Sequence, residues 1–204
     1  MHLFDQRIIG IVILFLLGTL VVVKRMASGS VLDRPQGNFF LLVVNGFNLF
    51  FLLIVNPLAA ILLITRYMEI IDPTRLAIDE PWTLLFLEII GLVIYVVGYF
   101  LMAQALIILG RCYQLGGSAP RSEDKMVIGG PYKLIRHPMY TAALSISLGL
   151  ACLVQSWAFF SVFAIYLVLI ILLIPVEEEG LGKAYGLEFV DYRQKTKKLI
   201  PFVY

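Results

Sequence analysis

The stretch from Met139 to Ile174 reads MYTAALSISLGLACLVQSWAFFSVFAIYLVLIILLI, and it decides the fold. At 1.5 Å per residue, its 36 residues would form one helix of about 54 Å, whereas the hydrocarbon core of a bilayer is about 30 Å thick. The polar break Gln155-Ser156-Trp157 lies at its middle. We therefore predict two short membrane-spanning helices joined by a tight turn at this break.

Three further apolar stretches precede this hairpin and are long enough to span a membrane. They are Ile8–Val23, Phe39–Thr65 and Trp82–Leu109. Two cations, Lys24 and Arg25, directly follow the first stretch, which is typical of a stop-transfer segment and not of a cleaved signal peptide. The sequence thus predicts five spans in total.

The composition agrees with a membrane protein. Apolar residues make up 60% of the chain and charged residues 15%, and the mean hydropathy is +0.92. Soluble domains carry about 25% charged residues. We predict an all-α integral membrane protein that forms a single membrane domain over residues 1–204. Residues 1–110 hold the first three spans, and residues 111–204 hold a loop, the helical hairpin and a C-terminal tail.

The distribution of lysine and arginine predicts the orientation. With five spans, the N-terminus, the segment 66–81 and the turn at Gln155 share one side, which holds 3 of these cations. The segments 24–38 and 110–138 and the tail share the other side, which holds 13. The positive-inside rule places the second side in the cytoplasm, so the N-terminus is external and the C-terminus cytoplasmic.

The tail after Glu179 shows a helical pattern. Leu181, Tyr185, Phe189 and Tyr192 recur at the spacing of one helix face. We expect a C-terminal amphipathic helix that packs along the membrane surface or over the mouth of the hairpin.

Metal and nucleic-acid chemistry are not indicated. The two cysteines, Cys112 and Cys152, form no CxxC motif, and His2 and His137 are the only histidines, so we expect no metal site. The net charge of +2 comes from basic residues scattered over loops, and no nucleic-acid partner is expected.

Ionisable residues gather at both ends of the hairpin. The run GPYKLIRHPMY occupies positions 130–140, and Glu177-Glu178-Glu179 ends the apolar stretch. Ionisable groups at membrane depth are costly and indicate a functional site by default. Pro138 favours a helix start, whose N–H groups, with Arg136 and His137 beside them, suit a carboxylate or phosphate.

The other polar groups of these runs suit different parts of a ligand. Tyr132 and Tyr140 offer flat faces for an aromatic ring or a cation, and Glu177 and Glu178 suit an ammonium or a hydroxyl. S-adenosylmethionine combines an anionic end, a cationic end and an aromatic base, so it would satisfy all of them. The same residues, taken singly, also fit lipid-headgroup anchors, an aromatic belt and a solvated helix end.

Taken in order, these motifs resemble those of the isoprenylcysteine carboxyl methyltransferase family of integral membrane enzymes. The resemblance covers roughly residues 125–201, and it consists of GPYxxxRHPxY, an apolar hairpin, EExxL, an aromatic-Gly pair, spaced aromatics and a final Ile-Pro. These occur here as Gly130–Tyr140, Glu177–Leu181, Tyr185-Gly186, Phe189, Tyr192 and Ile200-Pro201. The RHPxY motif alone is also shared by phospholipid methyltransferases and sterol reductases.

The resemblance implies a cofactor and its site. It implies that S-adenosyl-L-methionine is bound by the strand-like stretch Lys125, Met126 and Val127, by Tyr132, Arg136, His137, Pro138, Met139 and Tyr140, and by Glu177. Glu177 would bind the amino-acid portion, and Arg136 would orient the loop or the cofactor carboxylate. Relatives often place an arginine, which holds the substrate carboxylate, where this chain has Leu173. Another cation, such as Arg193, would then position the substrate, together with Glu178.

The implied reaction is methyl transfer to the carboxylate of a lipidated substrate such as a C-terminal prenylcysteine. An α-carboxyl has a pKa of about 3.3–3.7, so it is already ionised and needs no acid–base residue. Three alternatives stay open: a phospholipid or amine N-methyltransferase, a sterol-type reductase that uses NADPH, and a non-enzymatic membrane protein that binds lipid.

Overall fold

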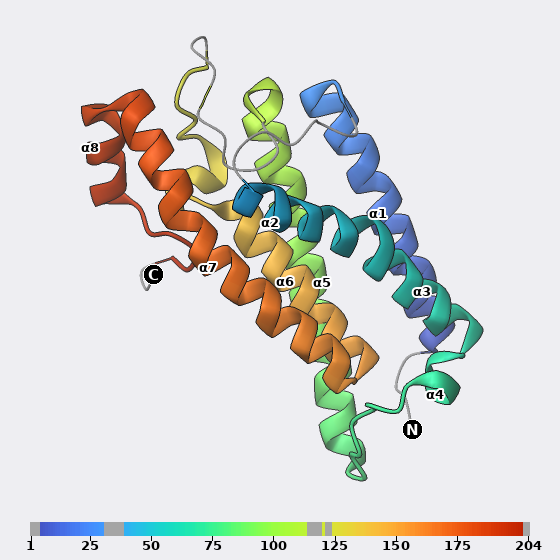
Figure 1. Cartoon of the computed structure of the whole chain (residues 1–204). Helices are drawn as coiled ribbons and strands as arrows, with labels where there is room; N and C mark the ends of the chain where they lie inside the picture. The colour runs from blue at the N-terminus through green and yellow to red at the C-terminus, as the bar shows by residue number, and fades with distance from the viewer. Residues whose placement is uncertain (1–4, 31–38, 114–119, 121–123, 202–204) are drawn as a thin grey trace.

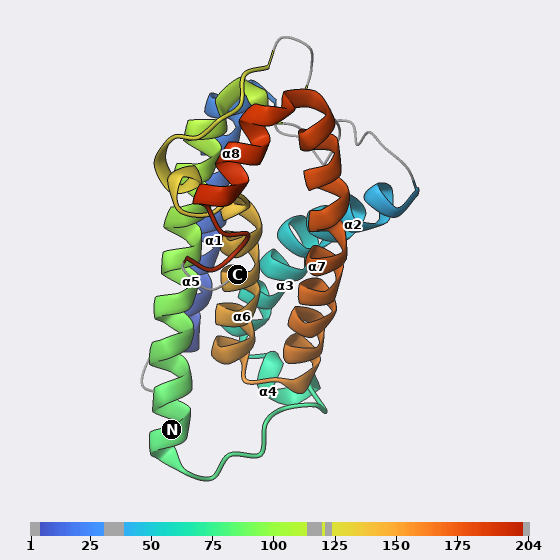
Figure 2. The same ribbon diagram turned by 90° about the vertical axis from the view of Figure 1, so that its left-hand side faces the viewer.

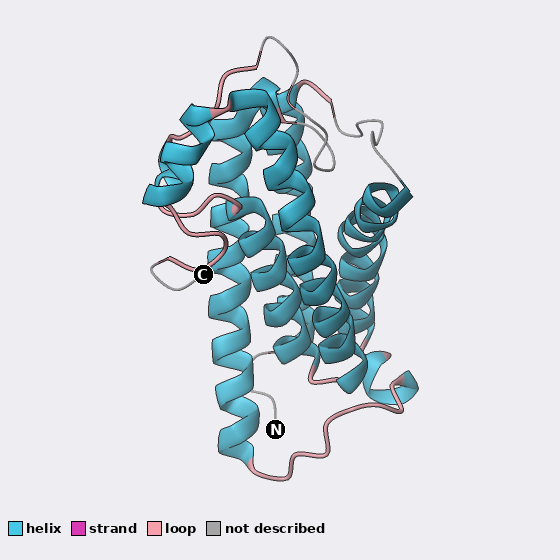
Figure 3. Ribbon diagram, turned by 60° about the vertical axis from the view of Figure 1, so that its left-hand side comes forward, coloured by secondary structure: helices cyan, strands magenta, loops and turns pink. Residues whose placement is uncertain are grey.

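The computed structural model describes residues 5–30, 39–113, 120 and 124–201. The regular structure in these ranges is helical (Figure 3). Four helical segments are long and apolar enough to cross a membrane, and a shorter apolar helix, Pro138–Val154, lies between the last two. The predicted all-α membrane fold is confirmed, with helices at each of the five predicted spans.

The first two spans differ in regularity. Asp5 caps the start of helix α1 (Gln6–Ser28), where its Oδ1 accepts a hydrogen bond from the Arg7 backbone N–H at 3.0 Å, and Gly29 caps its end. The second span is composite: α2 (Phe39–Phe50) leads through a π-helical turn (Phe51–Val55) into α3 (Asn56–Thr65). A π-helical turn inside a helix often marks a functional site because it redirects the side chains around it.

The last two spans form the predicted hairpin. Helix α6 (Pro138–Val154) begins at the predicted proline, and α7 (Trp157–Tyr185) follows after only two residues. Gln155 takes a left-handed conformation in the turn, and its carbonyl accepts a hydrogen bond from Leu76 N at 2.9 Å. The loop before α5 (Pro81–Leu109) therefore holds the tip of the hairpin in place.

The ends of the helices divide into two groups, as a five-span chain requires. At one end, Arg66 Nη2 lies 3.4 Å from Asp5 Oδ1, and Thr74 hydrogen-bonds to Ser156, with α4 (Met68–Ile71) in the same region (Figure 1). At the other end, Lys24 lies over the Tyr113 ring, near the short 3-10 turns Gly110–Cys112 and Gly130–Lys133. The predicted grouping of the loops is thus confirmed, while the side that each group faces stays a prediction from charge.

The tail differs from the single amphipathic helix that the pattern predicted. Helix α7 continues past the apolar stretch to Tyr185, and α8 (Leu187–Lys195) starts in a new direction after Gly186, whose φ is +56°. Figure 2 shows α8 folded back across the end of the bundle. The predicted apolar face is therefore split over two helices, because a positive φ at a glycine turns the chain.

Close packing of α5 against α6 fixes the position of the hairpin. A Cβ atom added to Gly149 would lie 2.6 Å from Tyr95 N and 2.7 Å from Gly91 O, both backbone atoms. Small residues at such contacts allow two membrane helices to approach closely. No side chain can move aside here, so even one methyl group would push the helices apart.

We predict that Gly149→Ala destabilises the protein. Overpacking a close contact costs about 1–3 kcal/mol, so thermal unfolding in detergent micelles should show a clearly lower midpoint. Gly46→Ala is the control, because a Cβ atom there meets nothing within 4 Å. Equal midpoints for the two variants would show that the contact between α5 and α6 is not as tight as described.

Candidate functional site

The site begins with a short loop that enters α6. Gly130 has a φ of +53°, which a glycine adopts without strain, and Ile108 of α5 lies where its side chain would be. The turn Gly130–Lys133 buries Pro131 and Tyr132, and the carbonyl of Tyr132 accepts a hydrogen bond from the Tyr192 hydroxyl at 2.7 Å. The loop is therefore fixed between α5 and α8.

The C-terminal segment runs beside this loop and ties it down. Arg136 N donates to Lys197 O at 2.7 Å, and His137 N donates to Lys198 O at 3.1 Å. One turn into α6, the Thr141 hydroxyl donates to Leu199 O at 2.8 Å. Residues far apart in the sequence thus form one layer over the start of α6.

Arg136 is the centre of this layer. Its Nε donates to Glu178 Oε1 at 2.7 Å, and its Nη1 donates to the carbonyls of Thr196 at 2.5 Å and Arg193 at 3.2 Å. The side chains of Arg136 and Glu178 are 5% and 7% exposed, so this ion pair is buried. A buried charge needs such partners, and the guanidinium therefore joins the start of α6, the end of α7 and the tail.

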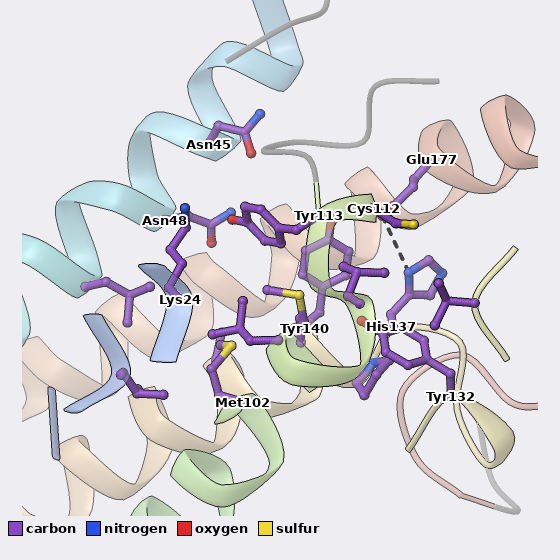
Figure 4. Close-up of a pocket in the computed structure, with 18 of the residues that line it drawn as sticks. Lys24, Asn45, Asn48, Met102, Cys112, Tyr113, Tyr132, His137, Tyr140 and Glu177 are labelled. Atoms are coloured by element: carbon purple, nitrogen blue, oxygen red, sulfur yellow. Dashed lines mark ion pairs between the residues drawn. The ribbon is translucent and has the colours of Figure 1, made fainter. Parts of the chain in front are cut away.

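His137 lies between two carboxylates. Its Nε2 is 3.3 Å from Glu178 Oε1, and its Nδ1 is 3.5 Å from Glu177 Oε2 (Figure 4, dashed line). The imidazole also stacks on the Tyr140 ring, with centroids 5.5 Å apart and planes inclined by 16°. Burial alone would lower the pKa of His137, but the adjacent carboxylates of Glu177 and Glu178 outweigh burial and raise the pKa above 6.5.

The nearby phenols stay neutral. Burial, and then the negative charge of Glu177, raise the pKa of Tyr132 above its ordinary value. Burial also raises the pKa of Tyr192 to about 12, although the charge of Arg136 works in the opposite direction. Both hydroxyls are therefore hydrogen-bonding groups and not bases at neutral pH.

A cavity of about 500 Å³ opens beside this cluster. Pockets for small ligands are commonly about 300–1,000 Å³. All ten residues expected to bind the cofactor line it: Lys125, Met126, Val127, Tyr132, Arg136, His137, Pro138, Met139, Tyr140 and Glu177. The structure brings them together from the loop, α6 and α7, although Lys125–Val127 is an irregular segment and not a strand.

The two residues expected to position the substrate lie elsewhere. Glu178 is directed to Arg136 and His137, and it is not among the described residues that line the cavity. Arg193 is exposed, and its contact with the site is the hydrogen bond that its carbonyl accepts from Arg136. The geometry gives Glu178 the place of a positioning residue for Arg136 and His137.

Sequence reasoning missed the wall opposite His137. Helices α1, α2 and α5 contribute Lys24, Asn45, Asn48 and Met102 to the cavity, and Tyr113 joins them from just after the turn Gly110–Cys112. Figure 4 shows these residues across from His137 and Glu177. The sequence feature that could have indicated this wall is the pair Asn45 and Asn48, two polar residues inside an apolar span. Asparagines inside membrane helices commonly hydrogen-bond to a neighbouring helix, and Asn48 Oδ1 accepts a hydrogen bond from the Tyr166 hydroxyl of α7.

Among the described residues, no group of three His, Cys, Asp or Glu side chains is placed to hold a metal ion. The fold and the site define a helical membrane protein with a ligand cavity at one end of its last hairpin. A family model described as phospholipid methyltransferase matches residues 86–188, just over half of the chain, so the protein belongs to this family.

Two relatives are similar to part of this chain. Protein-S-isoprenylcysteine O-methyltransferase B of Arabidopsis thaliana is 30% identical over 125 residues, which are 55% of this chain and 58% of that protein. The cobalt-zinc-cadmium resistance protein CzcN of Cupriavidus metallidurans is 30% identical over 102 residues, 50% of this chain and 47% of that protein. The chain thus spans less than two thirds of the length of either relative.

A solved structure has the same fold. The eukaryotic intramembrane Ras methyltransferase ICMT, an isoprenylcysteine carboxyl methyltransferase, is 19% identical, with a TM-score of 0.54 over 95% of this chain and 85% of that chain. The resemblance that the motifs indicated is confirmed by these relatives, and the fold is shared along nearly the whole chain.

We predict that the stability of the protein falls as pH rises above about 6.5. Folding raises the pKa of His137, so its stabilising effect is complete below the unfolded pKa and is lost as pH rises through the folded pKa. The unfolding midpoint, measured from pH 6 to pH 9 in detergent, should decline in the wild type and decline less in His137→Asn.

His2 is the other histidine of the chain and provides the control. His2→Asn should follow the wild-type profile. If His137→Asn has the same slope as the wild type, the imidazole does not bind a proton on folding, and the described carboxylate contacts do not act on it.

Proposed function

We propose that this protein transfers a methyl group from S-adenosylmethionine to the carboxylate of a lipidated substrate, such as a C-terminal prenylcysteine. The observation that supports this most is the Glu177 carboxylate. Its Oε2 is buried and lies 3.5 Å from His137 Nδ1, yet it makes no hydrogen bond with a described residue. A buried acceptor of this kind fits a ligand that supplies its own N–H donor, such as an ammonium.

The rest of the cavity fits the same molecule. Tyr132 and Tyr140 line it together with Met139, which gives an aromatic and polarisable surface for a purine ring and a sulfonium. The backbone at the start of α6, with Pro138 as its first residue, presents a helix N-terminus that favours a carboxylate. The methyl donor would therefore lie between α6, the loop and Glu177.

The chemistry needs positioning and not proton transfer. A carboxylate and a sulfonium carry opposite charges, and both charges disappear as the methyl group moves, so a cavity of low dielectric favours the reaction once both molecules are bound. Alignment of the two reactants contributes up to about 7–11 kcal/mol. In this proposal His137 and Arg136 hold the site in shape and act as neither base nor acid.

The names of the relatives favour this acceptor, and the charge distribution favours a cytoplasmic site. The relative from Arabidopsis thaliana is named an isoprenylcysteine O-methyltransferase, and the structure with the same fold is titled a Ras methyltransferase. The segments predicted to share the cavity's side of the membrane also hold 13 of the 16 lysine and arginine residues of the sequence. A soluble donor would reach the cavity from the cytoplasm and a lipid from the bilayer.

We predict that Glu177→Ala abolishes binding of S-adenosylhomocysteine, measured by calorimetry on the purified protein in detergent. The variant removes the carboxylate proposed to bind the ligand ammonium. Glu179→Ala is the matched control, because Glu179 is 68% exposed and pairs with Lys183. Wild-type affinity in Glu177→Ala would remove the proposed donor site. Tighter binding of NADPH than of S-adenosylhomocysteine by the wild type would favour a reductase.

A second acceptor is suggested by the family description, phospholipid methyltransferase. An amine acceptor must lose a proton, so its methylation should accelerate with rising pH, whereas a carboxylate is already ionised at pH 6–8. We predict that the wild type, supplied with donor labelled in the methyl group and with N-acetyl-S-farnesylcysteine, forms a methyl ester that releases labelled methanol when treated with alkali. The rate at which the enzyme forms this ester should not change between pH 6 and pH 8.

A phosphatidylethanolamine acceptor, assayed in parallel, should remain unlabelled. A product that keeps its label in alkali, formed from the amine lipid alone, would show that the enzyme is an N-methyltransferase. Binding of S-adenosylhomocysteine would stand in either case, because the donor site is common to both reactions.

A further inference from the structure

The cavity extends beyond the residues assigned to the methyl donor. Its second part lies between the helices of the first half of the chain and is lined by Leu17 and Val21 of α1, Leu49 and Leu52 of the second span, and Met102 and Leu106 of α5. These side chains are all apolar. Because the lobe is continuous with the donor site, a molecule in it can reach the methyl group.

Lys24 brings a positive charge to the wall that lines this lobe. Its Nζ donates to Ser30 O at 3.2 Å and lies 4.8 Å from the centre of the Tyr113 ring, and both contacts orient the ammonium along the wall. Figure 4 shows Lys24 directed toward Asn48 and Tyr113, across the cavity from Glu177. Glu177 and Lys24 thus bring opposite charges to facing walls of the cavity.

Asn45 adds an unused donor to the lining of the cavity. The residue is 1% exposed and lines the cavity, and its Nδ2 has no hydrogen-bond partner among the described residues. A buried N–H group without a hydrogen-bond partner is energetically unfavourable. An oxygen atom of a bound molecule would remove this penalty.

We propose that Lys24 and Asn45 bind the carboxylate of the methyl acceptor, and that the apolar lobe between α1, α2 and α5 holds its lipid chain. This inference rests on the proposed function and deepens it, because it assigns the acceptor head to residues that the motifs do not contain. An ammonium and an amide N–H are both donors, and a carboxylate accepts from both. An amine headgroup in the same place would be repelled by Lys24, so this wall selects acids over amines.

Three other cations near the cavity are less suited to this role. Arg136 already donates to Glu178, Thr196 and Arg193, and His137 lies between two carboxylates. The Arg193 side chain is exposed. Lys24 is the lysine on the α1 wall of the cavity, on the side that also holds the apolar lobe.

The assignment leads to a balanced transfer step. One oxygen of the acceptor carboxylate forms a bond to the methyl carbon while the bond from that carbon to sulfur breaks, and the electron pair of the broken bond stays on sulfur. The products are a neutral methyl ester and a neutral thioether, and no proton moves. Loss of the acceptor charge weakens its attraction to Lys24, which favours release of the ester.

The test compares Lys24→Gln with Arg25→Gln, a neighbouring cation that is exposed. We expect Lys24→Gln to raise the KM for N-acetyl-S-farnesylcysteine about tenfold or more, the size of one lost charge-assisted hydrogen bond. Its affinity for S-adenosylhomocysteine should not change. Lys24→Arg should restore most of the loss, and Arg25→Gln should keep wild-type values for both ligands.

Comparing the binding of the acid with that of its neutral carboxamide separates recognition of the acceptor charge from a change in the shape of the cavity. The wild type should bind N-acetyl-S-farnesylcysteine more tightly than its carboxamide, and Lys24→Gln should lose most of this preference. Equal preference in the two proteins, or an unchanged KM in Lys24→Gln, would overturn the assignment. Direct binding of the acid is measured without the donor, so an acid that binds the wild type and not Lys24→Gln supports the acceptor site even if methyl transfer fails.

Discussion

The buried ion pair between Arg136 and Glu178 is the interaction on which the rest of the structure depends. It joins the residue before α6 to the end of α7, and the same guanidinium holds the carbonyls of Thr196 and Arg193. Removing one partner of a buried pair is destabilising by about 3–5 kcal/mol, since it leaves a charge without compensation. The pair fixes His137 and Glu177 in their places, and these two residues face the cavity.

The composition of the cavity reflects two opposing physical requirements. A membrane helix bundle gains stability by excluding polar groups, whereas a zwitterionic donor and an anionic acceptor need charged partners. At the cavity the protein meets both requirements by placing Glu177 and Lys24 where two apolar spans end. The interior between them stays apolar, which suits a reaction in which opposite charges cancel.

Much of the fold could be predicted from the sequence, because membrane spans are read from length and hydropathy. The turn at Gln155 followed from a stretch too long for one helix, and the start of α6 followed from Pro138. The bend at Gly186 and the π-helical turn at Phe51–Val55 could not be predicted, because neither interrupts the pattern of apolar residues in the sequence. The same limit applies to the cavity. Motif residues close in sequence were found, whereas Lys24 and Asn45 come from other helices and belong to no motif.

The central claim is that Glu177, His137 and Tyr140 enclose one bound methyl donor at the end of the last hairpin. A structure of the protein with S-adenosylhomocysteine tests it most directly. The account predicts the amino group of the ligand within hydrogen-bonding distance of Glu177, and its base within the cavity bounded by Tyr132, Met139 and Tyr140. Ligand density at another place, or a closed cavity with the His137 and Glu177 side chains turned apart, would contradict it.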